Sequence, residues 1–180
     1  MVDAGRAAFD SLGAVCDGRS LSFVGDFATG HFGGLRKTLS LWSDPAGRFN
    51  VRGTYIEILG VGRTITRMSV SVHSKTIDNL ELSTVIDDGI GELPERRPPR
   101  VLIETLPVGT PADPLISRHL QTLANSSDIR PILPASLIAD VEGDSLEYVD
   151  DMLQRGLIRW CEVSEIDSLE SNPSALYPFA

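Results

Sequence analysis

Hydrophobic residues recur at helical spacing at the start of the chain and at every second position after it. Between Val2 and Val15 they stand at Ala4, Ala7, Ala8, Leu12 and Val15. This spacing predicts a short amphipathic helix that ends at Asp17 and Gly18. From Leu21 onward the period is two, as in a strand with one buried face. A type I turn is expected at Asp44-Pro45-Ala46-Gly47, inside a hairpin that runs from Arg36 to Gly53.

Further strands follow this hairpin without an intervening helix. They are expected at Tyr55 to Val61, Thr64 to His73, Leu80 to Ile86 and Val101 to Leu106. Strands joined by turns form antiparallel sheets or small barrels, and the chain is therefore expected to belong to the α+β class. The Thr64 to His73 segment alternates well, which predicts that Arg67 and His73 face solvent.

Three prolines, at positions 107, 111 and 114, interrupt the pattern and indicate a boundary near residue 110. Beyond it, helical spacing predicts helices at Leu115 to Leu123, Pro134 to Val141 and Asp144 to Gln154, with Gly156 past the last helix end. A strand is expected at Leu157 to Val163. The predicted organisation is a β-rich domain at 1–110, an acidic helical domain at 111–170 and a loose tail at 171–180.

This order of three helices and a strand, with the ending Met152-Leu153-Gln154-Arg155-Gly156-Leu157-Ile158, resembles a winged-helix domain. The resemblance covers Pro114 to about Val163 and implies a third helix that reads the major groove of DNA. In this chain that helix carries Asp144, Glu147 and other acids instead of basic residues. A winged helix that binds protein is therefore the better interpretation.

Charge is distributed unevenly along the chain. Residues 111–180 contain twelve acidic and four basic residues, a balance of −8, whereas residues 1–110 are close to neutral. Phosphate contacts need Lys and Arg, so this acidity disfavours binding of nucleic acid. The 35–75 segment is basic, with seven Lys or Arg against two acids, and its candidate anion-binding residues are Arg36, Lys37, Arg52, Arg63 and Arg67. These basic strands could dock on the acidic helices, bind phosphate groups or form an ordinary solvated face.

The acidic residues of the last predicted helix have two interpretations. Asp144 is placed as an N-cap, and Glu147 would stabilise the start of the helix dipole. Alternatively, the helix presents an acidic surface to a partner. The candidate protein-binding residues are Glu147, Asp150, Asp151, Gln154 and Trp160. Trp160 stands in an apolar segment, where a large aromatic residue is expected to be buried, although it could serve as an aromatic anchor.

Residues with catalytic chemistry form no recognisable motif. Cys16 and Cys161 are far apart and are expected to be free, buried thiols, and no metal-binding spacing or cofactor motif occurs. The Gly-rich segment from Gly30 to Thr38 differs from a phosphate-binding loop because Arg36 precedes the Lys-Thr pair and a strand follows. His31 in this segment is the best candidate for a general base. His73 and His119 are expected at the surface or half-buried.

These patterns together predict a non-enzymatic protein-interaction module, an adaptor, regulator or inhibitor that acts through its acidic helical surface. The partner would be another protein or a second copy of the chain. A nucleic-acid-binding regulator that uses the basic strands is the first alternative, and a small enzyme with a site near His31 is the second. No signal peptide or long apolar run occurs, so the protein is expected to be cytoplasmic, with no membrane contact.

Overall fold

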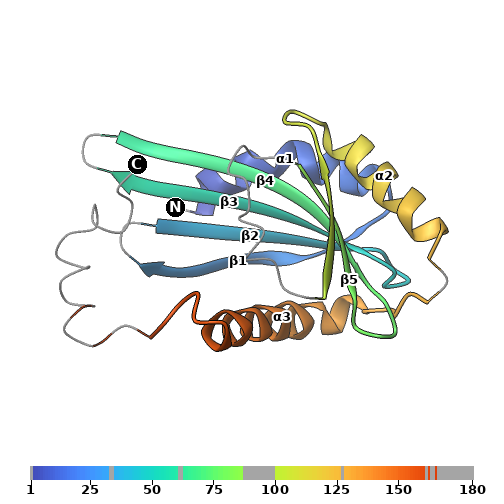
Figure 1. The fold of residues 1–180 in the computed structure, drawn as a ribbon. Coiled ribbons are helices and arrows are strands. Elements are labelled where there is room, and N and C mark those ends of the chain that lie inside the picture. The colour runs from blue at the N-terminus through green and yellow to red at the C-terminus, as the bar shows by residue number, and fades with distance from the viewer. Residues whose placement is uncertain are drawn as a thin grey trace.

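A twisted six-stranded sheet forms the centre of the molecule, with helices on both of its faces (Figure 1). The computed structural model describes residues 2–32, 35–60, 63–86, 100–126, 128–160, 162 and 165. Its elements in chain order are α1 (Val2–Gly18), β1 (Ser22–Phe32), β2 (Leu35–Ser43), β3 (Asn50–Gly60), β4 (Arg63–Lys75), β5 (Glu81–Ile86), β6 (Val101–Leu106), α2 (Ala112–Ala124) and α3 (Pro134–Gln154). The α+β class predicted from the sequence is confirmed.

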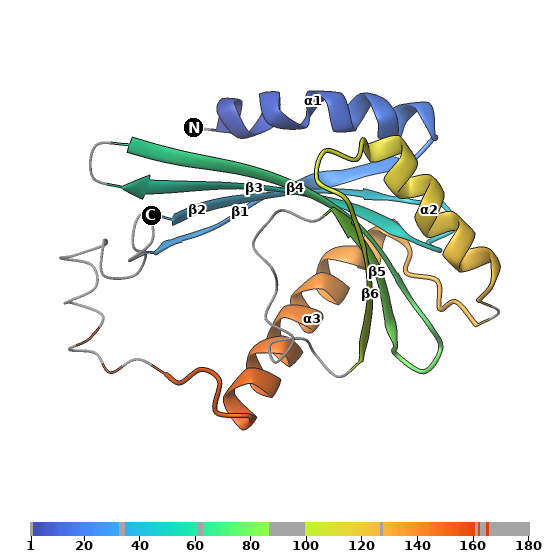
Figure 2. The ribbon, with the colours of Figure 1, turned by 45° about the horizontal axis from the view of Figure 1, so that its top comes forward.

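The strands lie in the sheet in the same order as in the chain. Pairs from β1 to β5 are antiparallel, as predicted, whereas β5 and β6 run parallel. The sheet is open and does not close into a barrel. Figure 2 shows α1 and α2 on one face, called here the upper face, and α3 on the opposite, lower face. None of the helices in the described ranges is both long and apolar enough to cross a membrane.

The predicted turn joins β2 to β3 and also holds the segment that precedes α3. The amide of Gly47 donates to the carbonyl of Asp44 at 2.7 Å, and Gly47 has a φ of 72°. A β-carbon at Gly47 would lie 2.7 Å from the backbone of Ile132. The amide of Ile132 in turn donates to the Gly47 carbonyl at 2.8 Å. Glycine is therefore needed here both for its backbone conformation and for this close approach.

The main hydrophobic core lies between the upper face of the sheet and the helices α1 and α2. Its buried members are Phe9, Leu12, Cys16, Leu21, Trp42, Phe49, Val51, Val70, Val72, Leu115 and Ile116. Gly53 lets α1 approach the sheet, because a β-carbon there would lie 2.8 Å from the side chains of Phe9 and Leu12. Since Leu115 and Ile116 belong to α2, the helix that follows the predicted boundary at residue 110 shares a core with the strands that precede it.

Cys16 is a free thiol within this core, as the sequence predicted. Burial, with a smaller contribution from the charge of Asp17, raises its pKa to about 12. A thiol in such a place is unreactive at neutral pH. Cys161 lies outside the described residues.

A smaller hydrophobic cluster lies between the lower face of the sheet and the first half of α3. Leu41, Ile132 and Leu137 are its buried members, and Val24, Phe27, Leu39 and Val141 pack around them. Leu39 and Leu41 are two residues apart on β2 and point to the same side of the sheet. Leu137 and Val141 are four apart on α3 and share one helix face. Beside this cluster, Asp140 and Asp144 of α3 contact charged residues of the strands instead.

The helical region differs from the prediction in two places. The two helices expected at Pro134 to Val141 and from Asp144 onward are one continuous helix, α3. Asp144 is not an N-cap, because it lies inside this helix and its carboxylate binds the sheet. The predicted helix end is confirmed: Gly156 has a φ of 67°, and its amide donates to the carbonyl of Leu153. Leu157 to Trp160 do not form the strand that was expected.

Candidate functional site

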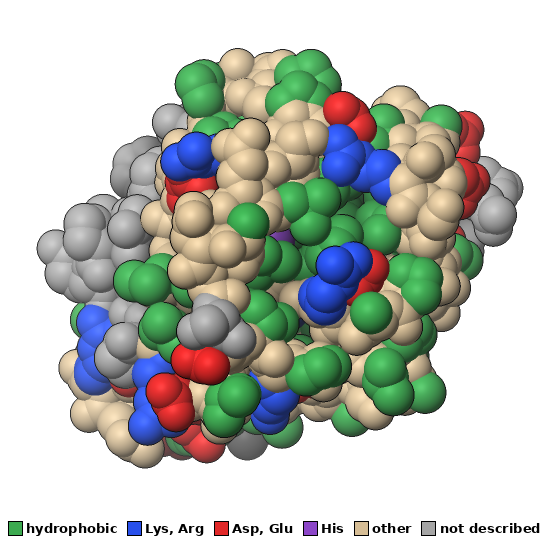
Figure 3. Space-filling model, turned by 90° about the vertical axis from the view of Figure 1, so that its right-hand side faces the viewer, with side chains coloured by type: hydrophobic (Ala, Val, Ile, Leu, Met, Phe, Trp, Pro, Cys, Tyr) green, Lys and Arg blue, Asp and Glu red, His purple; other side chains and the backbone are tan. Residues whose placement is uncertain are grey.

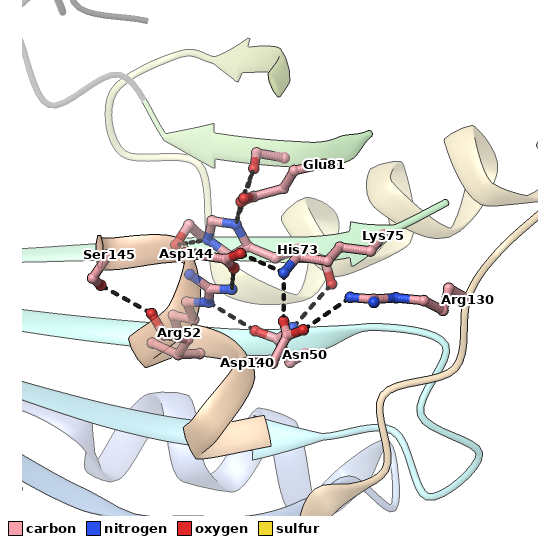
Figure 4. Close-up of polar contacts among 12 residues, drawn as sticks. Asn50, Arg52, His73, Lys75, Glu81, Arg130, Asp140, Asp144 and Ser145 are labelled. Atoms are coloured by element: carbon pink, nitrogen blue, oxygen red, sulfur yellow. Dashed lines mark hydrogen bonds and ion pairs between the residues drawn. The ribbon is translucent and has the colours of Figure 1, made fainter. Parts of the chain in front are cut away.

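A network of charged and polar side chains lies between the lower face of the sheet and α3 (Figure 4). It includes Asn50 and Arg52 from β3, His73 and Lys75 from β4, Glu81 from β5, Arg130, and Asp140 and Asp144 from α3. The two acids of α3 are four residues apart and therefore project from the same face of the helix. This face meets the basic side chains of the two central strands.

Lys75 connects α3 to the sheet. Its ammonium group lies 2.8 Å from the carboxylate of Asp140 and also donates a hydrogen bond to Asp144. Arg130 donates to the other carboxylate oxygen of Asp140 at 2.9 Å. Arg52 lies 3.7 Å from Asp144, and its Nε donates to the side chain of Asn50 at 2.9 Å. One ammonium, two guanidinium groups and two carboxylates thus hold the middle of α3 against the sheet.

Burial changes the protonation equilibria of this network. Desolvation raises the pKa of Asp144, although the hydrogen bond and positive charge of Lys75 oppose the shift. Desolvation likewise lowers the pKa of Arg52, against the attraction of Glu81 and Asp144. Both ions therefore lose hydration energy, which their ion pairs and hydrogen bonds within the network offset. Such contacts add little net stability but require that α3 lie where each charge meets its partner.

His73 and Glu81 form a hydrogen-bonded pair at one end of the network. The Nδ1 atom of His73 lies 2.5 Å from a carboxylate oxygen of Glu81, and Ser83 donates to the same oxygen at 2.9 Å. Desolvation and the nearby charge of Arg52 lower the pKa of His73, so the imidazole is neutral. Desolvation opposes ionisation of Glu81, but the hydrogen bond from His73 and the charge of Arg52 outweigh it and lower its pKa. Nδ1 is consequently the donor to an ionised carboxylate.

The other ring nitrogen of His73 lies 2.7 Å from Oγ of Ser71. Ser71, His73 and Glu81 thus have the connectivity of a hydrolytic triad. Two observations favour a structural role. An imidazole with a strongly lowered pKa accepts a proton poorly at neutral pH. Neither Ser71 nor His73 belongs to the described lining of the cleft beside α3 or of the recess beside α1.

A cleft of about 780 Å³ opens beside the network, between α3 and the strands β5 and β6. We call it the α3 cleft. Its described lining consists of Lys75, Asn79, Glu81, Arg100, Val101, Arg130, Ala139, Asp140, Gly143, Asp144, Glu147, Tyr148, Asp150, Asp151 and Gln154. Six of these residues are acidic and three are basic, so the lining carries excess negative charge.

The charged residues of the cleft differ in whether they form ion pairs within the chain. Lys75 binds the carboxylates of Asp140 and Asp144, and Arg130 binds that of Asp140. These ion pairs neutralise the negative charge of the two aspartates. Glu147 and Asp150 form no ion pair with any side chain that the structure describes, and Asp151 pairs with Arg155 at 2.9 Å. The rim contributed by α3 is therefore acidic, and Arg100 stands in the lining on the other side.

The structure brings together four of the five residues that the sequence suggested for protein binding. Glu147, Asp150, Asp151 and Gln154 all line the α3 cleft. Trp160 does not belong to the lining, and 74% of its surface is exposed. The expectation that Trp160 is buried is wrong, because the strand that would have carried it into a core does not form.

The basic residues suggested for anion binding are occupied within the chain where their side chains are described. Arg52 lies under α3, and Arg36 pairs with Glu57 on the neighbouring strand at 3.3 Å. Lys37 and Arg67 also take part in interactions within the chain. The side chain of Arg63 lies outside the described part. Of the three interpretations of the basic strands, docking on the chain's own acidic helix is the one seen at Arg52 and Lys75.

Ion pairs are also frequent elsewhere on the molecule. Arg19 lies 2.6 Å from Asp113, Arg48 lies 2.8 Å from Asp44, and Arg118 lies 2.5 Å from Glu104. Figure 3 shows one end of the molecule, where basic and acidic side chains lie next to one another around a group of hydrophobic ones. Positive charge on this end is therefore largely neutralised by neighbouring carboxylates.

The structure describes the side chains of two of the three histidines. His73 is in the network under α3, with only 13% of its side chain exposed, and His119 is fully buried in the upper core. Burial, together with the nearby His73, lowers the pKa of His119 to about 4. Its ring nitrogens bond to Ser74 and Thr84 at 2.8 and 2.9 Å. His119 is therefore buried where a surface or half-buried position was expected. His73 is partly buried, as that expectation allows, although α3 covers the strand face that was expected to meet solvent. The side chain of His31 lies outside the described part of the chain.

Lys75, Arg100 and Arg130 are site residues that the sequence analysis did not select. No local pattern marks Lys75 or Arg130, because their partners are at least ten residues away along the chain. Within the described ranges, no group of His, Cys, Asp and Glu side chains is arranged to hold a metal ion.

Searches against protein-family models, curated proteins and solved structures found no match to this chain. They therefore say nothing about the winged-helix resemblance, which stays a prediction. The function has to be inferred from the geometry of the molecule itself.

Proposed function

We infer that the protein is a non-enzymatic interaction module that binds a basic segment of another protein in the α3 cleft. The observation that carries this proposal is the gathering of Glu147, Asp150, Asp151 and Gln154 in one cleft with excess negative charge. Complementary charge increases the rate of association and selects among partners. A basic segment would meet the acidic rim first.

The chemistry of the cleft fits a peptide better than a metal ion or an apolar ligand. Its volume of about 780 Å³ is within the range of small-molecule and peptide sites. Gln154 and Tyr148 supply hydrogen-bonding groups, and the carboxylates of Glu147 and Asp150 accept from Lys or Arg side chains. The buried ion pairs below keep α3 in place, so the rim is preorganised.

A fluorescently labelled oligolysine peptide provides a direct probe of the cleft. Its binding is measured by fluorescence anisotropy at low and at moderate salt. We expect binding that Glu147→Gln together with Asp150→Asn weakens about tenfold, the sum of two exposed charge contacts. Gly143→Leu should also block the cleft, because a β-carbon at this lining glycine would have no atom within 4 Å and a side chain can extend into the space.

The matched control removes the same charge outside the cleft. Glu142 and Asp78 are exposed and do not belong to the lining. Glu142→Gln with Asp78→Asn should leave the affinity within about twofold of that of the original protein. Equal weakening by the two double variants would show attraction to the net negative charge alone and would contradict the proposal. So would full affinity in Gly143→Leu.

A further inference from the structure

A second recess lies on the upper face of the sheet, between α1 and the strands β1 and β2. We call it the α1 groove. It has a volume of about 440 Å³ and is lined by Phe9, Asp10, Gly13, Ala14, Asp17, Phe23, Asp26, Ser40 and Trp42. None of these residues is basic. The groove is separate from the α3 cleft and shares no lining residue with it.

The helical wall of the groove follows from sequence spacing. Asp10, Gly13, Ala14 and Asp17 stand at positions i, i+3, i+4 and i+7 and therefore lie on one face of α1. The two small residues leave space in the middle of this face, and the two acids stand at its ends. A β-carbon at Gly13 would have no atom within 4 Å.

Paired strand residues form the opposite wall. Phe23 is paired with Trp42, and Asp26 with Ser40, across β1 and β2. The ring centroids of Phe23 and Trp42 are 5.6 Å apart, and the ring of Phe9 on α1 lies edge-on to that of Trp42 at 6.5 Å. Trp42 and Phe9 are almost fully buried, whereas 52% of Phe23 is exposed. Phe23 is thus the aromatic ring that a ligand can reach.

The three carboxylates of the groove differ in their contacts. Ser40 donates a hydrogen bond to Asp26, which fixes this carboxylate beside the aromatic rings. Asp10 and Asp17 form no hydrogen bond or ion pair through their side chains with any side chain that the structure describes. An exposed ring framed by three acids, with no base in the described lining, attracts a cation, since aromatic faces and carboxylates both do so.

The shape of the groove selects among cations. A quaternary ammonium group is usually held between several exposed ring faces, and here one ring is open. A guanidinium group is flat: it stacks on a single ring and directs its N–H donors to carboxylates at the ring edge. We propose that the α1 groove binds an arginine side chain of a partner protein, stacked on Phe23 and hydrogen-bonded to Asp26 and Asp17.

The probe is a short acetylated and amidated Gly-Ser-Arg-Ser-Gly peptide, compared with the same peptide carrying citrulline or lysine. Binding is followed by NMR titration of the whole protein at millimolar peptide. The arginine peptide should shift the amides of Gly13, Phe23 and Asp26 and the indole N–H of Trp42. Citrulline is flat and polar but uncharged and should cause no such shifts. Lysine should bind more weakly because it cannot stack as a plane.

Three variants test the geometry. Phe23→Ala should weaken binding about fivefold and Asp17→Asn about twofold, the usual sizes for an exposed cation–π contact and an exposed ion pair. Gly13→Leu fills the groove and should abolish binding. The fold should be retained in all three variants. Phe23 and Asp17 are exposed, and at Gly13 leucine has a higher helix propensity than glycine.

Gly143→Leu is the matched control, since it fills the α3 cleft in the same way and should leave the arginine-induced shifts of Gly13, Phe23 and Asp26 unchanged. If Gly143→Leu and not Gly13→Leu removes binding, the arginine sits in the α3 cleft and the groove proposal is overturned while the proposed function stands. Equal shifts with the citrulline peptide, or none in the groove, also overturn it. Free L-arginine should bind more weakly than the peptide, because its α-carboxylate meets three acids. Equal affinity for free L-arginine and for the peptide would overturn the proposal that the ligand is an arginine side chain of a partner protein.

Discussion

On the upper face of the sheet, aliphatic and aromatic side chains of α1 and α2 pack into one buried cluster, whereas on the lower face α3 is held half by apolar contacts and half by ions. Successive residues of the same strands point alternately to the two faces. Val51 and Val72 point up into the core, and Arg52 and His73 point down toward α3. The strands therefore carry both kinds of contact within adjacent residues.

The difference lies in what each contact requires. Apolar packing is nondirectional and scales with the area removed from water, so it gives stability with moderate demands on position. Ion pairs such as those of Lys75 gain little net energy but tolerate no misplacement, because an unpaired buried charge is costly. The upper face thus supplies stability, and the lower face fixes the position of the helix that carries the α3 cleft.

Truncation in the upper core should have the largest effect. Leu12→Ala removes a side chain of which 2% is exposed and leaves a cavity between α1 and β3. We expect the free energy of unfolding to fall by about 4 kcal/mol. Urea denaturation measures this loss. Leu146→Ala, at a side chain that is 68% exposed, is the control and should change stability by less than about 0.5 kcal/mol. Similar losses in the two variants would contradict the comparison.

Removal of the central cation should rank next. Lys75→Met leaves Asp140 and Asp144 without their ammonium partner and should lower the free energy of unfolding by about 3 kcal/mol. The second change Asp144→Asn should then cost less than it does in the original protein, which a double-mutant cycle measures. Arg118→Met is the control, because the side chains of Arg118 and its partner Glu104 are 50% and 32% exposed, so loss of this ion pair should cost less than about 1 kcal/mol. Additive losses would argue against the network.

Acid should destabilise the protein through its buried histidines. The pKa of His119 is about 4 in the folded protein, against about 6.5 for an unfolded chain. Between these values the unfolded state binds a proton that the folded state does not, so stability falls as the pH decreases through this window. The loss for His119 should reach about 2–3 kcal/mol. His73, whose pKa is also lowered, adds to it in the same direction.

Urea denaturation at a series of pH values tests this dependence. His119→Gln should show a smaller loss of stability between neutral pH and pH 4 than the original protein. An unchanged pH dependence in the variant would mean that His119 is not the titrating group.

The smallest effect is expected at the rim of the cleft. Asp151 pairs with Arg155 one turn later on α3 at 2.9 Å, with both side chains partly exposed. Asp151→Asn should lower the free energy of unfolding by about 0.5 kcal/mol or less. Chemical denaturation at low and high salt measures it, and a larger effect would show that the rim also supports the fold. If the effect of Asp151→Asn on stability is small, a change in peptide binding by this variant can be assigned to loss of a contact with the peptide.

Local patterns in the sequence carried much of the fold. The period of two predicted strands in the regions of β2 to β6, although it did not delimit β1. The turn from Asp44 to Gly47 and the helix end at Gly156 are where turn chemistry placed them, and α1 follows its apolar spacing. Prediction failed at Gly143 and Asp144, which look like a break and a cap. The helix continues there because Asp144 finds its partner in Lys75, which is 69 residues away in the chain.

The sequence by itself determined the class of fold, the acidity of the last helix and which helix residues were candidates for binding, since these depend on residue type and short spacing. Only the tertiary structure decided that Arg52 and Lys75 are used inside the molecule, that His119 is buried, and that Arg100 stands in the same cleft as Asp150. The reason is that a residue's charge is local, whereas its burial and its partner depend on strands and helices that the chain brings together from distant positions.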